Sequence, residues 1–171
     1  MTLGAVIRKV KREDRDAVLA ILRAAFERAT EAAIVEQLWN SHAIKLERVA
    51  EIGGVVNGYV CYSTINTQPE LKGVLLGLGP LAVAPDHQNQ GVGAMLVTES
   101  LKACQENGAL LIAVLGDPAY YSRFGFEPAS KSKMSWAGFD AGDAFQILGR
   151  DDLDTDEIRT IHYHKAFDMA S

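Results

Sequence analysis

The junction between a strand and a helix at residues 81–94 constrains this chain more than any other segment. It reads Leu-Ala-Val-Ala-Pro-Asp-His-Gln-Asn-Gln-Gly-Val-Gly-Ala, so an apolar strand stops at Pro85 and a helix begins near Gly91. The first N–H groups of a helix have no partner within it, and the helix dipole places partial positive charge there. Since glycine has no Cβ, Gly91 and Gly93 let an anion approach that backbone closely. The junction therefore predicts a phosphate or pyrophosphate site.

Two common glycine-rich anion loops do not fit this segment. A Walker loop needs Lys and then Ser or Thr after its last glycine, but Ala94 and Met95 stand there. A dinucleotide fingerprint needs a small residue three positions after its second glycine, but that position is Leu96. What remains is the pattern Gln88-x-x-Gly91-x-Gly93-Ala94, which follows a strand ending in Leu-x-Val-x-Pro.

A second informative segment follows about fifteen residues later. Residues 109–116 form a continuous apolar run, which is typical of a strand buried on both faces. Residues 117–126 then read Asp-Pro-Ala-Tyr-Tyr-Ser-Arg-Phe-Gly-Phe. Asp117 and Pro118 suit the N-cap and first position of a short helix. Residues 109–126 therefore predict a strand that leads directly into a short helix rich in aromatic residues.

Together the two segments resemble the GCN5-related N-acetyltransferase (GNAT) superfamily. Its coenzyme A pyrophosphate loop has the pattern Gln/Arg-x-x-Gly-x-Gly/Ala, which residues 88–93 match. Its Tyr-x-x-x-Gly-Phe motif is matched by Tyr121, Gly125 and Phe126. The sequence motif Gly-Asp-Pro-Ala-x-Tyr-x-x-Phe-Gly-Phe resembles that of a bacterial subgroup of predicted acetyltransferases. The matching region covers about residues 74–128.

The resemblance implies an α/β (α+β) fold in one domain over residues 1–171. It implies a mixed sheet of about seven strands, splayed between the fourth and fifth, with about four helices. Gly77, Gly79 and Pro80 independently predict that strand pairing breaks near 79–81, because proline lacks a ladder donor and glycines weaken a strand. In the superfamily the cofactor's pantetheine arm fills that gap. By resemblance the cofactor-binding residues are Leu81, Ala82, Val83, Gln88, Asn89, Gln90, Gly91, Val92, Gly93 and Ala94.

Hydrophobic periodicity and turn residues place the remaining elements. We expect helices near 14–26, 31–39, 91–107 and 118–124, and strands near 5–10, 46–52, 55–64, 73–83, 109–115, 133–137, 144–148 and 158–167. In the superfamily the first two helices border the acceptor entrance, so Phe26 and Trp39 are either substrate contacts or core residues.

The resemblance implies direct transfer of an acetyl group from acetyl-CoA to a primary amine of a small molecule, peptide or protein. It assigns Tyr121 the role of general acid. A phenol with a pKa of about 10 can protonate a thiolate whose conjugate acid lies near 8.5 at a cost of roughly 2 kcal/mol. The alternative is that Tyr121 packs beside Phe124 and Phe126. A backbone N–H within residues 81–83 is the expected oxyanion donor.

A general base is not evident. Many superfamily members carry a glutamate on the long central strand, where this chain has Gly77, Gly79 and Leu81. Glu70, Asp86 and Glu127 lie outside that strand. This gap keeps a second hypothesis open, a regulatory protein that binds acyl-CoA without turnover. A different nucleotide-binding protein is a third.

Charge and hydrophobicity limit the classes of partner that this chain is expected to bind. The formal net charge of -5 argues against a nucleic-acid binder. No apolar run reaches membrane-spanning length and no secretory signal is visible, so we expect a cytoplasmic protein without a membrane partner. His162 and His164 lack a third ligand and the superfamily uses no metal, so we expect none. The sequence does not identify the acceptor or the length of the donor's acyl chain. It also leaves the oligomeric state open, and a homodimer is one possibility.

Overall fold

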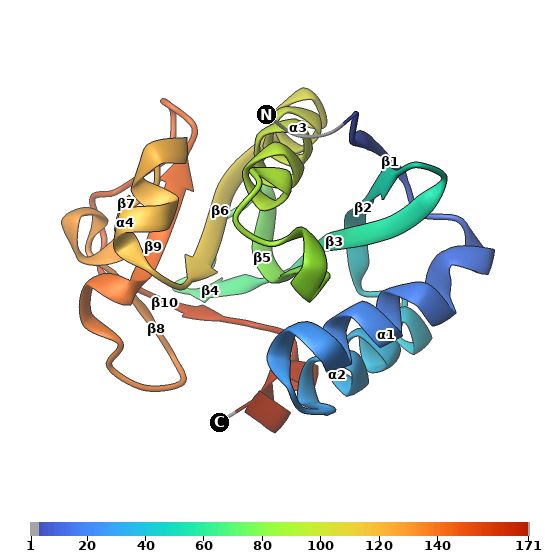
Figure 1. Cartoon of the computed structure of the whole chain (residues 1–171). Helices are drawn as coiled ribbons and strands as arrows, with labels where there is room; N and C mark the ends of the chain where they lie inside the picture. Colours follow the sequence, from blue (N-terminus) through green and yellow to red (C-terminus); the bar gives the residue numbers. More distant parts are fainter. Residues whose placement is uncertain (1–3, 171) are drawn as a thin grey trace.

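A mixed seven-stranded sheet forms the centre of the molecule, a computed structural model that describes residues 4–170 (Figure 1). Neighbouring strands pair antiparallel, except that β5 and β6 are parallel. In order across the sheet the strands are β1 (Val6–Lys9), β2 (Ile44–Ile52), β3 (Val55–Thr64), β5 (Val74–Val83), β6 (Ala109–Leu115), β9 (Phe145–Gly149) and β7 (Glu127–Pro128).

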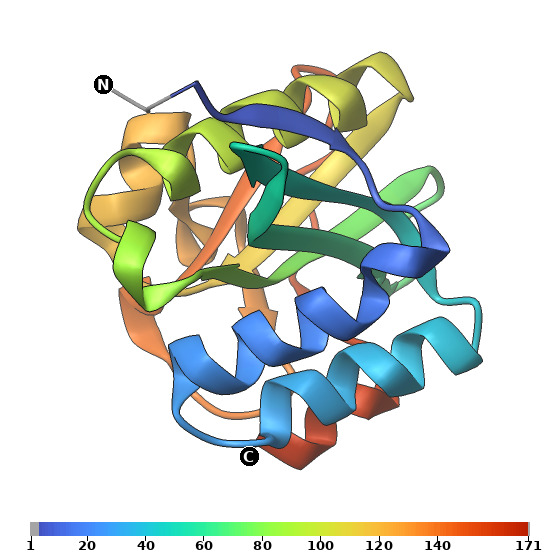
Figure 2. The ribbon, with the colours of Figure 1, turned by 45° about the vertical axis from the view of Figure 1, so that its right-hand side comes forward.

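Helices cover both faces of this sheet. The four α-helices of residues 4–170 are α1 (Arg15–Phe26), α2 (Thr30–Asn40), α3 (Val92–Glu106) and α4 (Pro118–Tyr121). Figure 2 shows α1 and α2 side by side on one face and α3 on the other. Short 3-10 helices occupy several connections: η1 (Arg12–Asp14), η2 (Pro85–His87), η3 (Ser122–Phe124), η4 (Ala129–Ser132), η5 (Gly142–Ala144) and η6 (Lys165–Ala170). The expected mixed sheet of about seven strands and the expected number of α-helices are confirmed.

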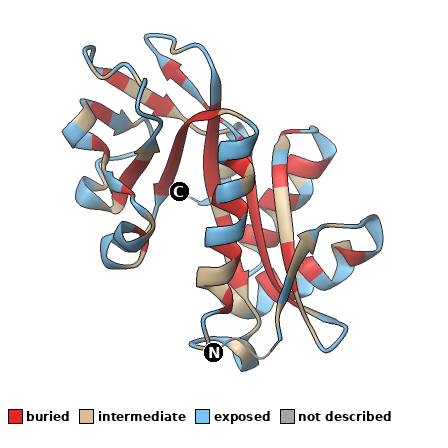
Figure 3. Ribbon diagram, turned by 90° about the horizontal axis from the view of Figure 1, so that it is seen from above, coloured by how far each residue is buried: buried red, intermediate tan, exposed pale blue. Residues whose placement is uncertain are grey.

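Each long helix turns one apolar stripe to the sheet. In α1 the buried residues Val18, Ile21 and Leu22 recur at spacings of three and four. They join the core on one face of the sheet, whereas Leu96 and Val97 of α3 join the core on the other. Figure 3 shows the result as buried residues along the strands and exposed residues on the outer sides of the helices. The sheet is therefore covered on both faces, and a ligand can reach its strands only where they separate.

The two central parallel strands separate halfway along their length. β5 and β6 pair from Val74–Ala109 to Leu78–Val114 and no further. β5 continues to Val83 while it pairs only with β3. Gly79, whose φ of 142° favours glycine, and Pro80, which has no N–H, follow the last pair directly. The predicted break near 79–81 is confirmed, and it exposes one backbone edge of Leu81, Ala82 and Val83.

A small second sheet, β4–β10–β8, lies beside the main one. It consists of β4 (Asn66–Gln68), β10 (Arg159–His162) and β8 (Met134–Trp136). The expected strand at 158–167 is wrong in its second half, because the chain leaves the ladder after His162. The backbone N–H of Ala166 donates to Nδ1 of His164 at 3.0 Å, which favours the turn into η6. The red segment η6 then packs against α2 (Figure 2).

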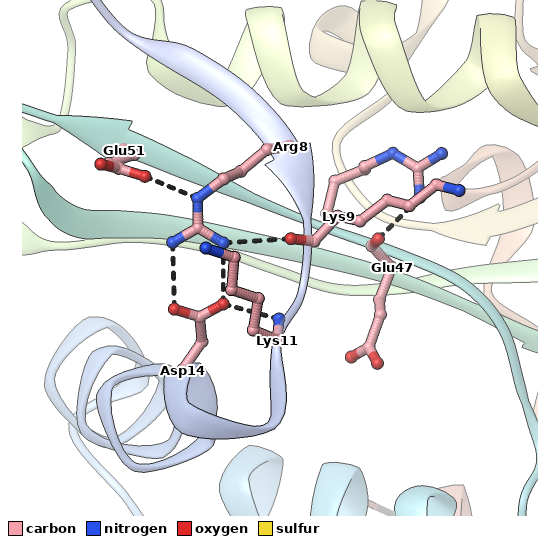
Figure 4. Close-up of polar contacts among 7 residues, drawn as sticks. Arg8, Lys9, Lys11, Asp14, Glu47 and Glu51 are labelled. Atoms are coloured by element: carbon pink, nitrogen blue, oxygen red, sulfur yellow. Dashed lines mark hydrogen bonds and ion pairs between the residues drawn. The ribbon is translucent and has the colours of Figure 1, made fainter.

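An ion-pair cluster joins the start of α1 to the edge of the sheet (Figure 4). The guanidinium of Arg8 donates two hydrogen bonds to Asp14, at 2.8 and 3.0 Å, and its Nε donates to Glu51 at 2.5 Å. Asp14 also accepts the backbone N–H of Lys11 at 2.7 Å. The Arg8 hydrogen bonds lower the pKa of the buried Asp14 carboxyl from 3.8 to about 2. The cluster fixes the chain where it leaves β1 and enters the helical layer.

Asp14→Asn is expected to lower the free energy of unfolding by about 2 kcal/mol at pH 7, because it removes a carboxylate whose pKa the Arg8 contact lowers from 3.8 to about 2. Since the folded-state pKa is the lower one, the contribution is complete above about pH 4 and is lost as the pH falls through about 2. Urea unfolding at pH 7 and at pH 2 to 3 measures both values. Asp16→Asn, at an exposed position on the same helix, is the control. Equal effects of the two substitutions at pH 7 would contradict the prediction.

Candidate active site

A cavity of about 750 Å³ lies where β5, the start of α3 and α4 approach one another. The free edge of β5 forms one wall and the predicted anion loop forms another. Ala25 and Phe26, at the end of α1, close a third side. Of the ten residues expected to bind the cofactor, eight line this cavity: Leu81, Ala82, Val83, Gln88, Asn89, Gly91, Gly93 and Ala94.

The N-terminus of α3 gives this cavity its unpaired N–H groups. Gly91 is the N-cap, with a φ of 84°, and no side chain caps the helix. The N–H of Met95 donates to the Gly91 carbonyl at 3.0 Å, the first bond of the helical ladder. The N–H groups of Val92, Gly93 and Ala94 consequently have no partner within the helix. Three donors at the positive end of a fifteen-residue helix fit an anionic group.

The other two expected residues, Val92 and Gln90, do not line this cavity. The side chain of Val92 is buried in the core beneath α3. The amide of Gln90 donates back to the carbonyl of Asp86 at 3.4 Å. Gln88 is partly committed as well, because its side-chain N–H donates to the Val83 carbonyl at 3.0 Å. That bond ties the loop to the end of β5 and sets the shape of the anion site.

Residues from α4 and η3 complete the larger cavity. The ring of Tyr120 lies beneath the guanidinium of Arg123 at 4.4 Å, and both side chains line the wall. A Cβ at Gly93 would come within 2.9 Å of the Tyr120 hydroxyl, so glycine at this position lets α3 and α4 approach. His87 also lines the cavity, and its buried Nδ1 has no hydrogen-bond partner among the described residues. The guanidinium of Arg123, stacked on Tyr120, therefore places a positive charge on the wall beside the N-terminus of α3.

A second, smaller cavity of about 340 Å³ opens on the other side of the break in the sheet. Its walls include Leu78, Gly79 and Pro80 of β5, Val114 and Leu115 at the end of β6, and side chains from α2, β8 and η6. Phe26 and Leu81 line both cavities. The two spaces thus meet at the parted end of β5.

Tyr121 belongs to the smaller cavity. Its ring is buried and packs edge-to-face on Tyr120 and Phe126, with centroids 5.0 and 5.8 Å away. Burial raises the pKa of the phenol well above its usual value, so the hydroxyl carries its proton across the physiological pH range. No hydrogen bond engages this hydroxyl among residues 4–170. The ring is therefore held by packing and the hydroxyl stays protonated, as a weaker acid than a free phenol.

At Gly77, one of the three positions at which a glutamate of the central strand could stand, the space is filled. A Cβ on Gly77 would lie 2.7 Å from a ring carbon of Tyr163, whose hydroxyl donates to the Ala113 carbonyl at 2.8 Å. The exposed Glu70, Asp86 and Glu127 line neither cavity. Sequence reasoning missed Glu31, a buried carboxylate of α2 that lines the smaller cavity. Its place in the first turn of a helix gave no signal, because acidic residues are common there.

The structure also places Trp39, His162 and His164, which the sequence singled out. Trp39 lies in the core and donates its indole N–H to Glu47 at 3.0 Å, away from both cavities. β10 ends at His162, so His164 lies outside the strand. No cluster of His, Cys, Asp and Glu suited to a metal exists among residues 4–170. Within that same range, no helix has the length and apolarity needed to cross a membrane.

Comparisons with known proteins agree with this geometry. The model of the acetyltransferase (GNAT) domain family matches residues 6–129. The uncharacterized N-acetyltransferase YhbS of Escherichia coli K12 is 37% identical over 159 residues, which are 90% of this chain and 93% of the relative. A second relative, the uncharacterized N-acetyltransferase YjhQ of the same strain, is 31% identical to this chain over 112 residues, which are 64% of this chain and 62% of YjhQ.

Two solved structures share most of the fold. The crystal structure of Escherichia coli YhbS in complex with CoA superposes with a TM-score of 0.89 at 33% identity, covering 98% of this chain and 94% of that one. A GNAT acetyltransferase from Brucella melitensis in complex with acetyl-CoA gives a TM-score of 0.80 at 31% identity, covering 96% and 99%. The family match covers well over half of the chain, and both structures extend the likeness to nearly all of it. The chain therefore belongs to the GNAT acetyltransferase family, and that membership makes it an acetyl-CoA-dependent acyltransferase.

Proposed function

We propose that this chain transfers the acetyl group of acetyl-CoA directly to a primary amine. The observation that carries the proposal is the meeting of two cavities at the parted end of β5, where Phe26 and Leu81 line both. A donor in the larger cavity and an acceptor in the smaller one would face each other there. Direct attack requires this geometry, because the amine nitrogen must reach the thioester carbon without a covalent enzyme intermediate.

The larger cavity has the donors that coenzyme A requires. The unpaired N–H groups at the start of α3 suit the pyrophosphate, and Arg123 supplies a cation on the same wall. The free backbone edge of Leu81, Ala82 and Val83 can pair with the amide groups of the pantetheine arm as a strand would. The YhbS and Brucella structures, which hold CoA and acetyl-CoA, support this assignment.

Tyr121 supplies the proton that the leaving thiolate needs. Attack by the neutral amine forms the carbon–nitrogen bond and breaks the carbon–sulfur bond. A free N–H on the β5 edge stabilises the oxyanion that forms in between. Tyr121 gives its proton to the sulfur, and water carries the proton lost by the nitrogen back to the phenolate. The apolar smaller cavity favours the neutral form of the amine through desolvation, which lessens the need for a strong base.

Calorimetry with coenzyme A tests the donor site. Gly91→Ala, at a φ of 84° on the cavity wall, is expected to weaken binding by roughly tenfold, the value of about one charge-assisted hydrogen bond. Gly54→Ala is the matched control, because its φ of 80° imposes the same backbone strain in a turn with open space around it. Absence of coenzyme A binding by the unmodified chain would refute the proposed function.

Tyr121→Phe tests the general acid. It is expected to lower kcat for acetyl transfer by about hundredfold or more, while the affinity for coenzyme A stays unchanged. Tyr62→Phe removes another buried phenol hydroxyl, one bonded to Ser100 outside both cavities, and should leave kcat unchanged. A regulator without turnover would release no thiol from acetyl-CoA in the unmodified chain or in either variant. Thiol release and calorimetry measure the two quantities.

Gly116→Ala tests whether the ring of Tyr121 must keep its position. The new Cβ would lie 2.5 Å from a ring carbon of Tyr121, so the ring has to move. We expect a loss of kcat with coenzyme A affinity retained. In a Tyr121→Ala background the same substitution should have no further effect, since the two changes act on one contact. Additive losses in the double variant would contradict this account.

A further inference from the structure

The walls of the smaller cavity restrict what it can hold. Six aromatic side chains dominate them: Phe26, Tyr121, Trp136, Phe139, Tyr163 and Phe167. Phe26 and Phe139 are 37% and 55% exposed, and large apolar side chains left open around a cavity indicate an apolar ligand. Aliphatic side chains make up most of the remaining wall. Counted over residues 4–170, Glu31 is the single charged side chain that lines the cavity.

Some polar groups of this cavity already have partners. The Tyr163 hydroxyl donates to the Ala113 carbonyl at 2.8 Å, and the Gly79 carbonyl accepts the Cys61 thiol at 3.1 Å. The side-chain groups left for a ligand are the Tyr121 hydroxyl, the Trp136 indole N–H and the Glu31 carboxylate. Of these, only the carboxylate is purely an acceptor. A ligand satisfies the carboxylate with a donor such as an N–H, and it fills the space between the aromatic side chains with an apolar body.

Glu31 is held in place from the side away from the cavity. It is 7% exposed, and its carboxylate accepts Nε of Arg28 at 2.9 Å and also Nη2 of the same guanidinium. Arg28 does not line the cavity, and its side chain is 53% exposed. Each carboxylate oxygen retains a further lone pair after this bidentate contact. The pair is neutral as a whole, so it can accept an amine hydrogen bond without holding the amine strongly in its charged form.

Resting on the proposed function, we infer that the acetyl acceptor is a primary amine carried on an aromatic or branched apolar body, whose amino group is bound by Glu31. The body packs among the aromatic side chains around Trp136, and the amine faces the shared wall at Leu81. Polyamines and amino sugars fit poorly, because their additional polar groups would lose water without finding partners in this wall. The chain thereby selects small apolar amines.

A panel of amines tests the inference with the full chain and acetyl-CoA. We expect kcat/KM for 2-phenylethylamine to exceed the values for spermidine, glucosamine and lysine by at least about tenfold, from the cost of unpaired polar groups. Calorimetry of 2-phenylethylamine with the coenzyme A complex should show binding. A polar amine preferred in the panel, or no binding of 2-phenylethylamine, would overturn the inference.

Two pairs of variants test the residues. Glu31→Gln should raise KM for 2-phenylethylamine by about ten- to hundredfold, with a far smaller change in kcat and none in coenzyme A affinity. Glu36→Gln, on the exposed side of the same helix, is the control. Trp136→Ala should lower kcat/KM for the same amine by roughly tenfold, whereas Ile158→Ala, at an exposed site outside both cavities, should not.

The possible failures can be told apart. Loss of coenzyme A binding in the unmodified chain would remove the proposed function itself. Retained coenzyme A binding, with spermidine or glucosamine acetylated in preference, would leave the proposed function standing and overturn only the acceptor class. Equal behaviour of Glu31→Gln and Glu36→Gln would overturn the role of Glu31. If Glu31→Gln fails to fold, Trp136→Ala and its control Ile158→Ala still test whether the acceptor carries an apolar body that packs around Trp136.

Discussion

The parting of β5 from β6 after the Leu78–Val114 pair is the constraint on which the site depends. A parallel sheet buried under helices on both faces normally leaves no backbone open. Here Gly79 and Pro80 end the pairing in the middle of the sheet, so one strand edge stays free within a well-packed core. The break creates both the donor edge of the larger cavity and the inner wall of the smaller one.

The surrounding elements hold this opening in a fixed shape. On one side, Gln88 ties the anion loop to Val83, which places the helix terminus over the free edge. On another, the short helix α4 brings Tyr120 to the larger cavity and Tyr121 to the smaller one. Adjacent positions on a short helix point in different directions, so a single turn lines both cavities. The proposed acid, Tyr121, thus lies in the smaller cavity, which also shares Leu81 with the larger one.

Much of this arrangement follows from local sequence rules. Gly91 and Gly93 predict the anion loop, and Pro80 predicts the break, because glycine and proline act through the backbone alone. Glu31 and η6 could not be predicted in the same way. Their importance comes from packing between segments far apart in the chain, and an acidic residue in a first helical turn looks ordinary in sequence. The end of the strand at His162 likewise depends on a side-chain contact of His164 that periodicity does not encode.

The Gly77–Tyr163 contact has a consequence for how this enzyme could diverge. The tyrosine ring occupies the space above the central strand, so a side chain at position 77 requires a smaller residue at 163 and a shift of Ile65, which a new Cβ would approach to 2.9 Å. Neither change is tolerated well alone, since one causes a clash and the other leaves a void beside a buried carbonyl. The two positions should therefore vary together among relatives. A lineage that acquires a carboxylate at 77 has to give up this part of the aromatic wall first, and with it the acceptor preference that we propose.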